Sequence, residues 1–289
     1  MRTPISPQLE GDGTYRPSSF ALRVATKKTT DYDGHVFDNA YAGDQRILMI
    51  CTEEKAMTMA NGKKFSTGNH PVEMLVPMLH LRSAGFDIDV ATPTGAPVQI
   101  EMWAMPTEDT NVMALFAQFN DAFENPQALT DIVDETIGGS SKYLAVYIPG
   151  GHGAMLGLPD NVDVGKILNW AHDTGRHTLS LCHGPAALLA ANLPGTKTDT
   201  SGGTYLYDGY DVAVFPDAVD KQTPRIGYMP GHMPWRFGER LTELGVNIIN
   251  KKSTGAVHVD RKLITGDGPQ AANEFGRRAA DELLKAVNQ

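Results

Sequence analysis

The stretch Thr178-Leu-Ser-Leu-Cys-His-Gly-Pro185 decides how this chain can fold and act. Its first four residues form a short apolar run with a β-branched start, which is typical of a buried strand. The Gly-Pro pair ends that strand at once, and the Ala- and Leu-rich residues 186–191 favour a helix. Cys182 is therefore expected on a sharp turn between a strand and a helix, with His183 directly after it.

Such a turn gives a cysteine the setting of a nucleophile. The side chain leaves the carboxyl edge of the sheet near the N-terminus of the next helix, where unpaired N–H groups and the helix dipole stabilise a thiolate. The same N–H groups can hold an oxyanion. A free cysteine in an α/β core is more often a small buried hydrophobe, so the turn alone leaves both interpretations open. The adjacent histidine and the glycine-rich strand ends elsewhere favour catalysis.

Composition and charge restrict the class of protein. The 289 residues suffice for one large or two ordinary domains, and 41% hydrophobic with 20% charged residues is typical of a globular chain. The net charge of −9 argues against nucleic acid or an anionic membrane as a partner. No apolar run reaches the roughly 18 residues of a membrane span. Without an apolar N-terminal signal, and with only Cys51 and Cys182, the protein is expected in the reducing cytoplasm.

Strand-like and helix-like segments alternate, which predicts a doubly wound, mainly parallel α/β sheet, a flavodoxin-like sandwich. Residues 1–44 lack this pattern and are expected to form an N-terminal arm or small cap on a core of residues 45–289. Residues 52–64 are expected to be a polar loop, and residues 93–139 a small inserted cap with two short amphipathic helices. The expected strands are 46–51, 86–91, 143–148, 178–181, 210–215, 247–249 and a terminal pair, 256–259 and 262–265.

Two further features fall at the strand ends, where sites in such sheets lie. Gly150-Gly151 follows the third of the strands, and glycines there let the backbone approach a ligand closely, unless they only form a tight turn. The N–H groups of Gly151 and His183 are candidate oxyanion donors. Glu73 opens a helix, where its carboxylate suits the dipole. Beside Cys182 it would instead bond the sulfur or move a proton on the substrate.

A carboxylate from another strand end should orient the histidine beside the cysteine. Asp217 and Asp220 both follow the run 210–215, and either can serve, although one of them, Asp217 rather than Asp220, suits a helix N-cap. His152 and His232 follow glycines and are candidates for the wall of the pocket. No paired spacing such as HxxxH or CxxC supports a zinc site.

Several motifs resemble the PfpI-like superfamily, which is related to class I glutamine amidotransferases. They are Leu-Cys-His-Gly-Pro-Ala at 181–186, Pro-Gly-Gly-His-Gly-Ala at 149–154 and Phe-Ser-Thr-Gly-Asn-His-Pro-Val-Glu at 65–73. Within it, the chain is similar to the large bacterial branch called heat-shock protein 31, the glutathione-independent glyoxalase III and protein deglycase. The segments similar to that branch are Phe215–Pro224, Gly227–His232 and Met102–Pro106. The resemblance runs over nearly the whole chain.

The resemblance implies a Cys–His–acid triad. Cys182 is its nucleophile, His183 lies beside it, and the acid matches Asp220, while Glu73 matches the family's glutamate near the thiol. Family members are homodimers that act on methylglyoxal or glyoxal without an added cofactor. Some of them also hold unfolded proteins as chaperones.

The resemblance also bears on a metal. Members that bind one near the site use two histidines and a glutamate. The matching positions here are Arg82, Asp87 and Phe119, so two of the three ligands are lost. We therefore expect no zinc of that kind.

The leading hypothesis is an enzyme that converts methylglyoxal to lactate through a Cys182 hemithioacetal, with Glu73 or His183 moving the proton. The same adduct chemistry would remove glyoxal from modified Cys, Lys or Arg side chains of glycated proteins. One alternative is a protein that is chiefly a holdase chaperone, with an apolar patch exposed on the dimer. Another is a cysteine amidase or peptidase, because a cysteine elbow with an oxyanion hole also suits acyl transfer.

Overall fold

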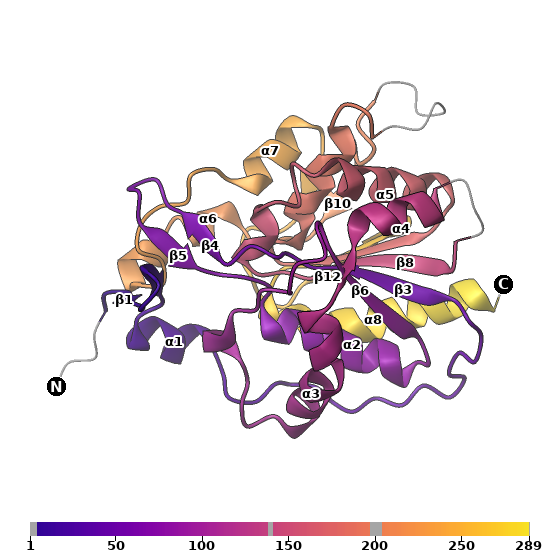
Figure 1. Ribbon diagram of the computed structural model, residues 1–289, viewed down its shortest axis with the longest axis horizontal. Coiled ribbons are helices and arrows are strands. Elements are labelled where there is room, and N and C mark those ends of the chain that lie inside the picture. The colour runs from indigo at the N-terminus through magenta and orange to yellow at the C-terminus, as the bar shows by residue number, and fades with distance from the viewer. Residues whose placement is uncertain (1–4, 138–140, 197–203, 289) are drawn as a thin grey trace.

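The central element of the fold is a seven-stranded sheet. The computed structural model describes residues 5–137, 141–196 and 204–288 (Figure 1). The strands are β3 (Arg46–Ile50), β6 (Asp87–Thr92), β7 (Gln127–Ala128), β8 (Tyr143–Ile148), β9 (His177–Leu181), β12 (Val257–Asp260) and β13 (Leu263–Gly266). Their order is β12-β13-β9-β8-β3-β6-β7, and every pairing is parallel except that of β12 with β13. The predicted doubly wound α/β sheet is confirmed.

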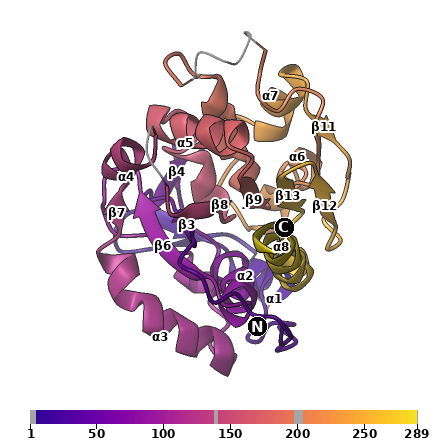
Figure 2. The same cartoon turned by 90° about the vertical axis from the view of Figure 1, so that its right-hand side faces the viewer.

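Helices cover both faces of this sheet (Figure 2). One face carries α2 (Pro71–Ser83), α3 (Thr110–Glu124) and α8 (Ala272–Val287); the other carries α4 (Leu129–Thr136), α5 (Val162–Asp173), the 3-10 helix η3 (Gly184–Asn192) and α7 (Phe237–Glu243). The strand β3 shows why both faces are apolar. Leu48 and Ile50 belong to the core under α5, whereas Ile47 and Met49 belong to the core under α2 and α8.

A second sheet lies beside the first and contains part of the predicted arm. It consists of β1 (Gln8–Leu9), β2 (Thr14–Arg16), β4 (Ala56–Thr58) and β5 (Lys64–Ser66), in the order β1-β2-β5-β4. The predicted loop 52–64 is thus wrong, because it contains a hairpin. Its signal was Asn61-Gly62, the turn pair that hairpins favour, with Gly62 at φ 80°. The helix α1 (Ser19–Ala25) follows β2, and residues 1–4 of the arm lie outside the described residues.

The predicted cap at 93–139 packs on the edge of the main sheet. Within it, η1 (Met102–Ala104) is a 3-10 turn, α3 packs on α2, α4 packs on α5, and β7 pairs with β6. Residues 138 and 139 lie outside the described part of the chain. The division into arm, core and cap stays a prediction.

The predicted strand 210–215 is shorter than expected. Only β10 (Asp211–Val212) forms, and it pairs in parallel with β11 (Asn247–Ile248), outside the main sheet. The strand stops because the backbone N–H groups that follow it bind acceptors outside a strand ladder. The N–H of Ala213 bonds Thr265 Oγ1 at 2.9 Å, and the N–H of Phe215 bonds the carbonyl of Cys182 at 3.0 Å, so no ladder continues.

Short helical turns complete the chain. They are η2 (His152–Met155), α6 (Asp217–Asp220), η4 (Thr223–Ile226) and η5 (Pro269–Ala271). Among the residues that the structure describes, no helix combines the length and the apolarity that a bilayer crossing requires.

Candidate active site

The turn at Cys182 has the strained geometry that the sequence indicates. β9 ends at Leu181, η3 begins at Gly184, and Cys182 between them has φ 60°. A side chain at positive φ is costly and persists only where its surroundings hold it. Here the N–H of Cys182 donates to the carbonyl of Gly266 at 2.8 Å, and its carbonyl accepts from Phe215 at 3.0 Å. The backbone on both sides therefore fixes the thiol at the carboxyl edge of the sheet.

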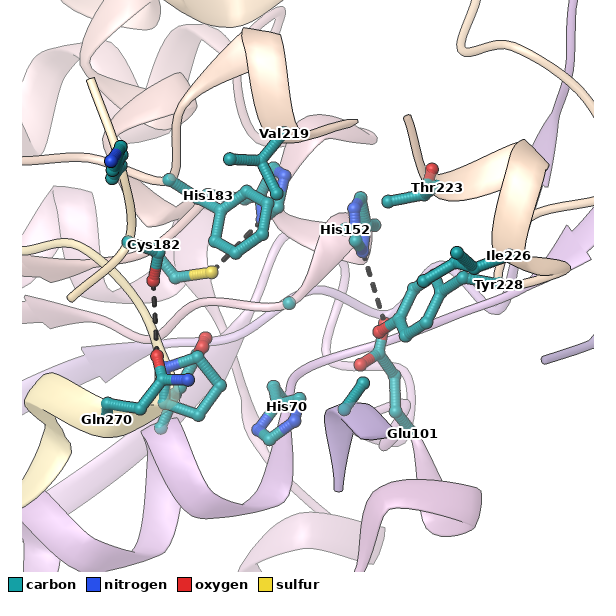
Figure 3. Close-up of a pocket in the computed structure, with 17 residues that line it drawn as sticks. His70, Glu101, His152, Cys182, His183, Val219, Thr223, Ile226, Tyr228 and Gln270 are labelled. Carbon is teal, nitrogen blue, oxygen red and sulfur yellow. Dashed lines mark hydrogen bonds and ion pairs between the residues drawn. The ribbon is translucent and has the colours of Figure 1, made fainter. Parts of the chain in front are cut away.

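Cys182, His183 and Asp220 form one hydrogen-bonded row, of which Figure 3 shows Cys182 and His183. The sulfur lies 3.2 Å from His183 Nδ1, and His183 Nε2 lies 2.8 Å from Asp220 Oδ2. Burial would raise the pKa of Asp220, but the neighbouring His183 and His152 outweigh it and lower the pKa to about 2. Asp220 is thus ionised and acts only as an acceptor, so His183 donates Nε2–H to it and turns Nδ1 to the thiol.

The other candidate acid lies elsewhere. Asp217 accepts from the N–H groups of Gly238 and Glu239, at 3.3 and 2.9 Å, and so caps the start of α7. Of the two alternatives that the sequence left open, only Asp220 contacts His183 among the described residues. Asp217 has the helix-capping role that the sequence favoured for it, although on a later helix.

Glu73 lies in the first turn of α2, fully buried beside the thiol. The hydroxyl of Tyr147 donates to the Glu73 backbone carbonyl and fixes this turn. The carboxyl group faces Cys182 and the N–H of Gly151, but no described group hydrogen-bonds either oxygen. Burial, supported by Glu101, raises the pKa of Glu73 well above its ordinary value. Burial and Glu73 raise the pKa of the Cys182 thiol in turn. This shift favours the protonated form of Glu73, which can donate a proton.

Gly150 and Gly151 bring the backbone close to the thiol. Gly151 has φ 104°, and its N–H faces both Cys182 and Glu73. The other expected oxyanion donor, the His183 N–H, belongs to the same turn as the sulfur. At Gly150, a Cβ atom would overlap Glu73 Oε2 and lie 2.6 Å from Cys182 Cβ. These positions agree with an oxyanion role, which stays a prediction.

Gly150→Ala should therefore damage both stability and the site. The added methyl group meets backbone and buried side chains that cannot move freely, so we expect a loss of roughly 1–3 kcal/mol in the free energy of unfolding. Chemical denaturation measures this, and iodoacetamide labelling reports on the thiol. Gly11→Ala is the matched control, because nothing lies within 4 Å of a Cβ there. Equal stability of the two variants would contradict the close approach.

Two residues that line the cavity were not predicted from the sequence, and only one of the two histidines expected in its wall lies there. Glu101 and His70 line the cavity, and His152 lines it as expected, whereas His232 is exposed and lies outside it. His152 Nε2 lies 3.1 Å from Asp220 Oδ1. Burial raises the pKa of Glu101 to about 7, and burial together with His152 and His183 lowers the pKa of His70 to about 3.

Glu101 reaches the site through a contact that no local signal reveals. The buried side chain of Asn69 donates to the carbonyls of Thr52 and Gln99, at 3.0 and 2.8 Å. It thereby ties the end of β3 and the start of α2 to the strand-like segment before Glu101. Thr67 Oγ1 then donates to Glu101 Oε1 at 2.8 Å.

The cavity above the thiol is small, with a volume of about 300 Å³. This is the lower end of the range of roughly 300–1,000 Å³ that small-molecule pockets occupy. Its lining combines polar groups, among them the thiol, Glu73 and Glu101, with apolar side chains such as Ala25, Val219 and Ile226. The arm helix α1 thus contributes to the wall through Ala25.

The residues present do not fit the metal that some relatives hold. Arg82 and Asp87 form an ion pair with each other, and Phe119 packs against Phe123 with ring centroids 5.9 Å apart. A guanidinium and a phenyl ring cannot replace two histidines as ligands. His152, His183 and Asp220 also have ligand atoms within 4.8 Å of one another, but the hydrogen bonds described above account for that spacing.

Comparisons with known proteins agree with this fold. Residues 64–213 match the DJ-1/PfpI family. The chain is 46% identical over 288 residues, 99% of its length and 98% of the relative's, to the protein/nucleic acid deglycase HchA of Escherichia coli O157:H7. It is equally similar to protein/nucleic acid deglycase 1 of Escherichia coli K12. The chain therefore belongs to the DJ-1/PfpI family, as the resemblance implied.

Solved structures show the same fold. Glyoxalase III from Candida albicans aligns with a TM-score of 0.61 at 22% identity, over 84% of this chain and 97% of that one. The Rapid Encystment Protein of 24 kDa from Francisella tularensis aligns with a TM-score of 0.68 at 21% identity, over 83% and 99%. At these identities the likeness establishes the α/β fold alone.

Proposed function

We propose that this protein is a glutathione-independent glyoxalase that converts methylglyoxal to lactate through a Cys182 hemithioacetal, and that it also acts as a protein deglycase. The arrangement that supports this most is the position of the thiol, which lies 3.2 Å from His183 Nδ1 and beside the carboxyl group of Glu73, whose pKa burial raises. A nucleophile, a base and an acid then meet in a cavity of about 300 Å³. The deglycase name of relatives that share 46% of the sequence supports the same chemistry.

The first step joins the sulfur to the aldehyde carbon. His183 takes the thiol proton through Nδ1, and the sulfur of Cys182 forms a bond to C1 of methylglyoxal. The aldehyde oxygen becomes an oxyanion, which the N–H groups of Gly151 and His183 stabilise. Proton transfer from His183 completes the hemithioacetal, and Asp220 stabilises the transient imidazolium.

The second step is an isomerisation that needs no cofactor. His183 acts as the base and removes the proton from C1. The C1–C2 double bond forms and O2 takes a proton from Glu73, which gives an enediol. C2 then accepts a proton, and O1 loses one, which leaves a lactoyl thioester on Cys182. C1 is oxidised by two electrons and C2 is reduced by the same two, so the step balances within the substrate.

Hydrolysis of the thioester by water releases lactate and restores the thiol. In the deglycase reaction, the substrate enters as an adduct of glyoxal on a protein side chain. The expectation from the net charge of −9 that nucleic acid is not a partner is too broad. The relatives are named for nucleic acid as well as protein, and a modified base in the cavity needs no phosphate-binding surface. We infer action on glycated groups of either kind.

The product assay separates this function from its alternatives. Purified protein without glutathione should form lactate from methylglyoxal and glycolate from glyoxal, and Cys182→Ala should form neither while remaining folded. Amide or peptide hydrolysis without aldehyde turnover would instead favour the amidase. Suppression of aggregation that survives in Cys182→Ala would support a separate holdase activity. We also infer a cytoplasmic location, because both cysteines are free and the reaction needs a reduced thiol. The inference of a homodimer rests on the resemblance to family members that form one.

A further inference from the structure

A buried polar row continues from the triad across the cavity. Figure 3 shows its two ends, Cys182 with His183 on one side and His152 with Glu101 on the other. Asp220 binds His183 through Oδ2 and His152 through Oδ1, at 2.8 and 3.1 Å. The two imidazole rings lie 3.9 Å apart between centroids. His152 Nδ1 then lies 4.0 Å from Glu101 Oε1. The row thus runs from the sulfur to Glu101 through a carboxylate that two histidines share.

Addition and isomerisation leave the far half of this row without a role. Cys182, His183 and Glu73 suffice for both steps, yet His152 and Glu101 are buried and line the same cavity. Glu101 Oε2 has no hydrogen-bond partner among the described residues. Burying a polar atom without a partner costs free energy. A function at the site would explain why the chain keeps this oxygen there.

We propose that His152, supported by Glu101, is the general base that activates water for hydrolysis of the lactoyl thioester. The inference rests on the proposed function. Because Asp220 is an ionised acceptor, His152 donates Nε2–H to it, and Nδ1 is the ring nitrogen left to accept a proton from water. The 4.0 Å between Nδ1 and Glu101 Oε1 is too long for a direct hydrogen bond and short enough for one water to bridge both atoms.

His183 is less suited to this step. Both histidines bind Asp220 through Nε2, but Nδ1 of His183 faces the sulfur at 3.2 Å, where the acyl group is now attached. His183 remains placed to return a proton to the leaving thiolate. His152 approaches from the other oxygen of Asp220 and so offers a second base that the covalent bond does not block.

The step balances in atoms and protons. One proton of water passes to His152 Nδ1 as the oxygen forms a bond to C1. The tetrahedral intermediate then breaks its C1–S bond, which releases lactic acid and the Cys182 thiolate. The carboxyl proton restores the thiol through His183, and His152 releases its proton to solvent. The products are lactate, one proton and the free enzyme.

Two substitutions of His152 separate a base from a positioning residue. His152→Gln keeps an amide N–H near the place of Nε2 and loses the basic Nδ1, whereas His152→Asn is too short to reach Asp220. We expect His152→Gln to accumulate a thioester on Cys182, detected as a hydroxamate after hydroxylamine treatment. Its steady-state lactate formation should fall ~10²-fold or more, with the first turnover nearly unchanged. Glu101→Gln should show the same accumulation to a smaller degree.

The control is His232→Gln, which changes an exposed histidine outside the cavity and should behave as wild type. The inference is overturned if His152→Gln turns over as wild type without accumulation. It is also overturned if His152→Gln and His152→Asn lose the first turnover equally, since His152 would then only position Asp220. Absence of lactate with the wild-type protein would instead refute the proposed function itself, and that result needs no variant.

Discussion

Replacing Cys182 by serine should remove lactate formation from methylglyoxal almost completely, by at least about 10⁴-fold in kcat/KM. Serine occupies nearly the same volume and can adopt φ 60° as the cysteine does, so the turn between β9 and η3 should survive. What is lost is the thiol, which ionises far more readily than a hydroxyl and forms the thioester through which the product leaves. Circular dichroism and the initial rate of lactate formation measure both parts of this expectation.

Cys51→Ser is the matched control for that substitution. Cys51 is fully buried at the end of β3 and packs in the core under α2 and α8. Burying a hydroxyl there should lower the stability by roughly 1–3 kcal/mol, yet the folded fraction should keep its activity. Turnover that survives in Cys182→Ser, or that is lost only in Cys51→Ser, would contradict the assignment of the nucleophile.

Glu73→Gln should lower activity and raise stability at the same time. The glutamine amide has nearly the shape of the protonated carboxyl group, so the packing beside Cys182 is kept. It cannot exchange a proton with the substrate during isomerisation, and we expect a loss of ~10²–10⁴-fold in kcat. Rates of lactate formation measure this loss, and binding of methylglyoxal as a hemithioacetal should persist.

The stability effect follows from the raised pKa of Glu73. Burial holds this pKa well above 4.5, so above pH 4.5 the folded protein keeps a proton that the unfolded chain releases. Stability from this group is therefore highest below pH 4.5 and falls as the pH rises toward the folded-state pKa, by up to about 1.4 kcal/mol per pH unit. Glu73→Gln should escape this fall and exceed the wild type in melting temperature at pH 8.

Glu243→Gln controls for the amide itself, because Glu243 is exposed on α7. Its melting temperature should follow that of the wild type at every pH. Equal pH dependence of Glu73→Gln and the wild type would show that Glu73 is ionised in the folded protein, and would remove it as the proton donor of the second step.

The parts of the fold that the sequence predicted are those with local signals. The run 178–181 is apolar and ends at Gly-Pro, and β9 with its turn lies there. The strands β3 and β8 have a similar apolar run, whereas β6 alternates Asp87 and Asp89 with apolar residues. All three appear within a residue or two of their expected bounds. The hairpin β4–β5 also had a local signal in Asn61-Gly62, which the polar composition around it concealed.

The parts that could not be predicted depend on contacts between distant segments. Whether Asp217 or Asp220 contacts His183 is settled by the single turn of α6, which leaves one carboxylate on α7 and the other on the imidazole. Glu101 enters the cavity because Asn69 holds the preceding strand-like segment, and nothing in the residues around Glu101 signals this. Conformation at a turn is local, whereas the grouping of acids around a histidine is a tertiary property.

The most direct test of the account follows the aldehyde carbon itself. Methylglyoxal labelled with ¹³C at C1 is incubated with the purified protein in the absence of glutathione, and the label is followed by nuclear magnetic resonance. The label should leave the aldehyde hydrate and appear in the carboxylate of lactate, at a rate that is proportional to the protein concentration and is abolished by alkylation of Cys182. Label that remains in the hydrate, or that reaches lactate equally fast with the alkylated protein, would contradict the account.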